Sequence, residues 1–191
     1  MNRNFTLHSK ERILLMGSNI WNFADGMLGP LFAVFTAKVG GDVLEITWAW
    51  AIYLFVTGFM VIIFGKVSDK YSKEKLMVAG YALTAIFTFS YIFVQNPLHL
   101  FLVQAGLGIA LALCNPTWMA LYDKYSDESN DGYIWGLADG QTKMITALSI
   151  VLGGMIVNFF SFTVLFLIMG TIQVFATVYQ AQILLDKEKS A

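Results

Sequence analysis

The sequence has little charge for its length, and this shortage excludes two classes of protein. Charged residues make up 13% of its 191 residues, about half the share of an ordinary soluble domain. With 57% hydrophobic residues and a mean hydropathy of +0.64, too little polar surface remains for a soluble enzyme. The 12 Lys and Arg residues are balanced by 13 Asp and Glu residues, so the chain lacks the basic surplus of a nucleic-acid-binding protein.

Cysteine and histidine are also scarce. Cys114 is the only cysteine and lies in an apolar run, which excludes a disulfide scaffold and a cysteine-based metal site. His8 and His99 lie far apart, and neither has a metal-ligand spacing around it. We therefore expect no metal, no cofactor and no enzymatic activity. The remaining class is a polytopic membrane protein.

Long apolar runs take the place of the missing charge. A helix needs about 20 mostly apolar residues to cross the hydrocarbon core of a bilayer. Six runs fit: Ile13–Ala37, Ile46–Gly65, Leu76–Phe93, Leu98–Leu121, Tyr133–Val157 and Phe162–Leu184. Short connections join them, so the sequence predicts one all-α domain over residues 1–191 with six transmembrane helices.

The positive charges predict the orientation of these helices. If the six helices alternate in direction, ten of the 12 cations of the chain fall on one side: Arg3, Lys10, Arg12, Lys66, Lys70, Lys73, Lys75, Lys124, Lys187 and Lys189. Only Lys38 falls on the other side. Cytoplasmic loops carry the excess of Lys and Arg, so we expect both termini in the cytoplasm and the protein in the cytoplasmic membrane. Trp48 and Trp50 fit an aromatic belt at the outer surface.

Asp25 lies in the middle of the first expected span, where an ionisable group costs about 2.5–3.5 kcal/mol on insertion scales. Asn22 shares its helical stripe, and Asn19 adds a further amide to this run. Gly29 and Pro30 follow and permit close packing or a bend. A carboxylate that binds solute or protons is the favoured interpretation, because intramembrane carboxylates commonly mark pathways. The alternative is a carboxylate paired with a cation for assembly.

Lys143 lies near the middle of the fifth expected span, with Asp139 four residues earlier on the same helical face. Thr142 and Thr146 lie beside them. One interpretation is a cation that binds an anion or couples transport, with its pKa set by Asp139. The other is an ion pair that compensates itself, or a pair between Lys143 and Asp25 that holds helices together.

The fourth expected span carries Gln104, Asn115 and Trp118 on one broad face, and Asn115-Pro116 can kink it. These side chains could bind a polar solute, with Trp118 as a stacking platform, or they could join helices and mark the interface. The candidate substrate-binding residues are Asn19, Asn22, Asp25, Gln104, Asn115, Trp118, Asp139, Thr142, Lys143 and Thr146.

The connection after the second span, residues 65–75, reads GKVSDKYSKEK. It resembles the loop between helices 2 and 3 of the major facilitator superfamily, G-x-x-x-D-[RK]-x-G-[RK]-[RK]. The matching residues are Gly65, Asp69, Lys70 and Lys73. The Gly153-Gly154 pair is similar to a glycine pair late in the family's fifth helix. Leu102 stands where many proton-coupled members have an arginine.

The resemblance implies the N-terminal half of a facilitator, built from two inverted three-helix repeats. Helices 1, 2, 4 and 5 would line a cavity, and helices 3 and 6 would be peripheral. A parallel homodimer would complete a transporter that works by alternating access. Its substrate would be a small polar solute, sugar-like or anionic, driven by a proton or another ion or moving by facilitated diffusion. Asp69 would latch one state against the start of helix 5 of the partner, near Tyr133–Trp135.

Two alternatives to a homodimeric transporter remain open at this point. The chain could be a non-transporting scaffold or regulatory subunit in the lipid bilayer. It could also be an isolated half of a longer transporter, since its charged tail could lead into a central loop.

Overall fold

The computed structural model describes residues 9–126 and 131–185, and within these ranges every regular element is helical. The α-helices are α1 (Ser9–Gly26), α2 (Leu31–Lys38), α3 (Val43–Ser68), α4 (Lys73–Ser90), α5 (Pro97–Tyr125), α6 (Asp131–Phe159) and α7 (Phe162–Ala181). Short 3-10 turns follow α4 at Tyr91–Phe93 and α7 at Gln182–Leu184. The expectation of an all-α chain is confirmed for the described residues.

Five of the described helices are long and apolar enough to cross a membrane, namely α3 to α7. The first expected span is instead divided into α1 and α2 by a turn at residues 27–30. Pro30 has no amide hydrogen to donate to the turn before it. The amides of Met27 and Leu28 reach back to the carbonyls of Ala24 and Asp25. The sequence permits a bend at this point, and the structure has a complete break between two helices.

Side-chain caps begin several helices. Asp42 accepts a hydrogen bond from the Leu44 amide at 2.7 Å, and Glu45 reaches back to the Asp42 amide at 3.0 Å, which forms a capping box at the start of α3. Asn96 accepts from the His99 amide at 3.0 Å, with Pro97 as the first residue of α5. These caps fix the short connections between antiparallel neighbours.

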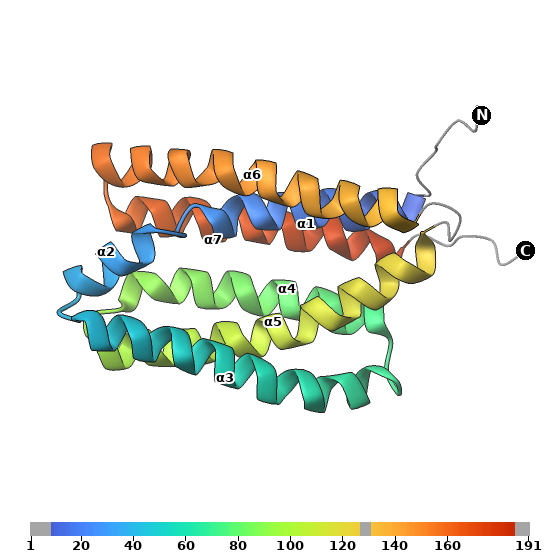
Figure 1. Ribbon diagram of the computed structural model, residues 1–191, viewed down its shortest axis with the longest axis horizontal. Coiled ribbons are helices and arrows are strands. Elements are labelled where there is room, and N and C mark those ends of the chain that lie inside the picture. Colours follow the sequence, from blue (N-terminus) through green and yellow to red (C-terminus); the bar gives the residue numbers. More distant parts are fainter. Residues whose placement is uncertain (1–8, 127–130, 186–191) are drawn as a thin grey trace, which may run out of the picture.

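The helices form two layers (Figure 1). One layer holds α6, α1 and α7, and the other holds α3, α5 and α4. Contact between the layers runs mainly through α4 and α7, whereas α1 and α5 touch little. The start of α1 and the end of α7 lie at the same end of the bundle as the α3–α4 connection.

The contacts repeat between the two layers. Helix α3 packs on α5 as α6 packs on α1, and α4 packs on α5 as α7 packs on α1. Exchanging α1 with α5, α3 with α6 and α4 with α7 therefore maps the main helix contacts onto one another, although α6 also touches α7 and α3 has no comparable contact with α4. Each exchanged pair also runs in opposite directions through the bundle (Figure 1).

Small residues set the spacing of the helices. A Cβ added to Gly80 of α4 would lie 2.7 Å from the backbone nitrogen of Cys114 on α5. A Cβ on Gly153 of α6 would collide with the backbone carbonyl of Met27, at the break after α1. Close backbone approach of this kind is typical of helix packing in membranes, where small residues form the contacts.

Helices α3 and α6 stand apart because the chain itself covers little of them. In the most apolar 18-residue window of each helix, 6% of the residues of α3 and 11% of those of α6 are buried. The corresponding shares are 39% for α4 and α7 and 50% for α5. Two long apolar helices therefore present most of their surface outward.

Candidate functional site

A cavity of about 220 Å³ lies between the two layers. It is lined by residues of α1 to α6, of the turn after α1 and of the 3-10 turn after α4. Its polar groups come from separate helices and include Asp25, Gln104 and Thr146. The first, second, fourth and fifth of the six expected spans all contribute to this lining, as expected. The third span was expected to be peripheral, but it also contributes Thr84 and Tyr91.

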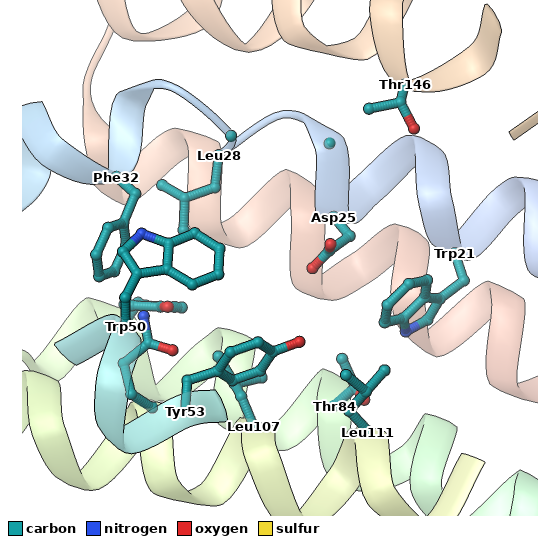
Figure 2. Close-up of a pocket in the computed structure, with 14 residues that line it drawn as sticks. Trp21, Asp25, Leu28, Phe32, Trp50, Tyr53, Thr84, Leu107, Leu111 and Thr146 are labelled. Atoms are coloured by element: carbon teal, nitrogen blue, oxygen red, sulfur yellow. The ribbon is translucent and has the colours of Figure 1, made fainter. Parts of the chain in front are cut away.

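Asp25 occupies the last turn of α1, directly before the break. Its carboxylate points into the space between the layers (Figure 2) and is exposed there. Among the residues that the structure describes, none forms a hydrogen bond or ion pair with this carboxylate. The expected alternative of an assembly pair between Asp25 and Lys143 is therefore not what the described residues form.

Aromatic rings form much of the cavity wall, and sequence reasoning missed this. Trp50 contacts Phe32 and Tyr53 edge-on, with ring centroids 5.8 and 5.6 Å apart. Trp21 lies on the other side of Asp25 (Figure 2). Trp50, which fits an aromatic belt by its place in the sequence, also lines the cavity. The available signal was its helical spacing to Tyr53, which places both on one face of α3.

A second cavity, of about 210 Å³, lies beside the first and shares Trp21 and Leu111 with it. Four of the predicted site residues come together in its lining: Asn22, Asn115, Trp118 and Thr142. Asn22 donates to the Ser18 carbonyl at 2.8 Å and to the Thr142 hydroxyl at 3.4 Å. This cavity is the more amide-rich of the two.

Trp118 and Asn19, which are both predicted site residues, hold helices together. The Trp118 indole donates to the Leu14 carbonyl at 3.2 Å and stacks on Tyr122 at 4.8 Å between ring centroids. The Asn19 amide donates to the Gln141 side chain at 2.7 Å, which joins α1 to α6, and Asn19 lines neither cavity. These two hydrogen bonds therefore support a role of Asn19 and Trp118 in joining helices.

Asp139 and Lys143 form an ion pair with 2.8 Å between carboxylate oxygen and ammonium nitrogen. Their side chains are 67% and 73% exposed, and neither residue lines the cavities. Thr142 and Thr146 of the same helix do line them. Since one residue corresponds to about 100° of helical rotation, Lys143 lies beside the cavity-facing stripe. The self-compensating pair is the arrangement in the structure.

The predicted gating loop lies at the end of the bundle where α6 begins (Figure 1), away from the cavity. Gly65 lies in the last turn of α3, and Asp69 follows directly after this helix. The Lys73 ammonium donates to the Ser68 carbonyl at 3.1 Å and closes the loop. Asp69 and Lys70 are exposed.

Comparison with known proteins agrees with this architecture. The family model described as the Major Facilitator Superfamily matches residues 14–190. Over 99 residues the chain is 26% identical to the multidrug resistance protein MdtG of Yersinia enterocolitica, and this match covers 50% of the chain but only 24% of MdtG. The resemblance stated from residues 65–75 is confirmed. The chain belongs to the Major Facilitator Superfamily, a family of membrane transporters.

Proposed function

We propose that this chain is one six-helix half of a secondary transporter that moves a small solute by alternating access. Its main support is the Asp25 carboxylate, which lies in a cavity between two helical layers and has no partner among the described residues. An ionised carboxylate at this depth in a membrane is costly, and residues of this kind usually face a cavity or a partner. Rocking of two halves around such a central site is how facilitators work.

The second half is, in this proposal, a second copy of the chain in parallel orientation. The outward surfaces of α3 and α6 would be covered by that copy, which explains why the chain itself buries so little of them. The repeated contact pattern supports two inverted three-helix repeats within each copy. A two-fold axis along the membrane normal would then bring two Asp25 cavities together.

The exposed loop supports a gating role in this assembly. Asp69 would approach the start of α6 of the second copy, where the helix dipole stabilises a carboxylate by about 0.3–1 kcal/mol. The loop lies at the same end of the bundle as the start of α6. The lysines of this loop would also place that end in the cytoplasm, with both termini, in the cytoplasmic membrane.

Uptake by proteoliposomes tests the proposed function. We would measure radiolabelled glucose, succinate and tetraethylammonium as neutral, anionic and cationic probes. We expect protein-dependent uptake of at least one probe, abolished by Asp25→Asn and retained by Asp123→Asn, an exposed carboxylate at the end of α5. A scaffold or regulatory subunit, the second candidate, would give no uptake and would depend on another protein for any activity.

The oligomeric state is tested by native mass spectrometry from membrane mimetics. The proposal expects twice the 21.3 kDa of one chain. A strictly monomeric, transporting chain would contradict the homodimer. A chain that transports only after joining a different six-helix partner would identify it as one half of a longer transporter.

A further inference from the structure

We infer that the Asp25 cavity binds the positively charged head of an organic ammonium compound, recognised by one carboxylate and a surrounding set of aromatic rings. This inference rests on the proposed function, because it names the solute class of the same site. It replaces the expectation of a sugar-like or anionic solute. Binding can nevertheless be measured without transport, so the two can fail separately.

The charge of the cavity favours a cation. Asp25 is the only ionisable acid or base of the described residues that line it, apart from the phenols of Tyr53 and Tyr91. No lysine or arginine of the described chain lines either cavity. Asp25 also sits in the last turn of α1, where the negative end of the helix dipole adds to its attraction for a cation. An anion would be repelled by Asp25, and no lysine or arginine of the described lining would offset that repulsion.

The walls favour an organic cation. Trp21, Phe32, Trp50, Tyr53 and Tyr91 all line the cavity, and Figure 2 shows Asp25 between Trp21 on one side and the Phe32 and Trp50 rings on the other. Aromatic rings attract ammonium groups through their negative faces, and aromatic cages recognise quaternary ammonium ligands. The edge-on contacts of Trp50 with Phe32 and Tyr53 hold these rings in place.

Metal ions fit this lining poorly. A metal ion needs several oxygen ligands, and the described residues contain no cluster of three His, Cys, Asp or Glu side chains. The wall is mostly aromatic and aliphatic carbon, which suits methyl groups on nitrogen. The volume of about 220 Å³ is below the roughly 300–1,000 Å³ of drug-sized sites. This half therefore holds a cationic head, and the remainder of the ligand extends toward the open side.

The test is isothermal calorimetry on the purified full chain in detergent, with benzyltrimethylammonium as the probe. Benzyl alcohol and benzenesulfonate supply the same ring without charge and with the opposite charge. We expect binding of the ammonium compound only. Equal binding of benzyl alcohol, or tighter binding of benzenesulfonate, would overturn the inference.

Variants separate the carboxylate from the rings. Asp25→Asn should weaken binding more than roughly tenfold, because the ammonium group loses its charged partner. Trp50→Leu should weaken it by roughly three- to thirtyfold, which is the range of one cation–π contact. Trp48→Leu is the control. Trp48 lies on the same helix, is 60% exposed and does not line the cavity, so this variant should leave binding unchanged. Equal affinities of Asp25→Asn and the unchanged chain would refute the site.

Folding and transport are controlled separately. Asp25→Glu keeps the charge and should retain part of the binding, so loss of binding in Asp25→Asn is not attributable to misfolding alone. If the ammonium compound binds but no probe is transported, the inference stands and the proposed function falls. If glucose or succinate is transported and the ammonium compound does not bind, the proposed function stands and this inference falls.

Discussion

Two adjacent glycines in α6 provide a matched pair for testing the helix packing around the cavity. A methyl group at position 153 would collide with the Met27 carbonyl at the break after α1, whereas one at position 154 meets no atom within 4 Å. In a helix interior, replacing glycine with alanine contributes roughly 0.5–1 kcal/mol of stability. Overpacking costs about 1–3 kcal/mol, and the colliding atom is backbone, which cannot rotate away.

We therefore expect Gly154→Ala to match or exceed the stability of the unchanged chain. Gly153→Ala should be less stable than Gly154→Ala by about 1–3 kcal/mol, which is the overpacking cost alone. The measurement is reversible unfolding of each purified variant in mixed micelles by a denaturing detergent, followed by circular dichroism. Equal free energies of unfolding for the two variants would refute the close approach of α6 to the broken helix.

Three further predictions concern the caps, the ion pair and the orientation. Asn96→Ala should lower the unfolding free energy by about 1 kcal/mol in the same assay, because the amide at the start of α5 loses its cap; an unchanged value would contradict the cap. The double variant Asp139→Asn/Lys143→Gln should bind benzyltrimethylammonium with unchanged affinity in calorimetry, because the ion pair lies outside both cavities. Loss of binding by a folded double variant would show that the pair contributes to the site. In a cysteine-free background, an impermeant thiol reagent should label Tyr71→Cys only from the cytoplasmic side and Val43→Cys only from outside, because the excess of lysines predicts a cytoplasmic position for the connection that holds Tyr71. The reverse pattern would invert the proposed orientation.

The sequence predicts those parts of the site that depend on position within one helix. Asp25 stands out because a charge inside an apolar run is costly wherever the neighbouring helices lie. The Asp139–Lys143 pair follows from its i,i+4 spacing. These features are local, so a single sequence carries them. Gly29 and Pro30 permit a bend, but the sequence predicted one continuous span here and the structure has a break.

Features that depend on neighbouring helices were not predictable. Trp50 lies near the end of an apolar run, where a belt residue and a cavity residue have the same local sequence. Only the position of α3 opposite α1 decides between them. The bonds from Asn19 to Gln141 and from Trp118 to Leu14 join positions 122 and 104 residues apart, and helical spacing gives no information on such partners.

We propose that the cavities of two copies together form a solute path that opens alternately to each side of the membrane. The most direct measurement is the labelling of Asn115→Cys, in a chain whose Cys114 is replaced by alanine, by an impermeant thiol reagent in vesicles of each orientation. Asn115 lines the second cavity and is exposed in it. Alternating access predicts labelling from both sides, and prior addition of benzyltrimethylammonium should slow it. Labelling from one side only, or from neither, would contradict alternating access.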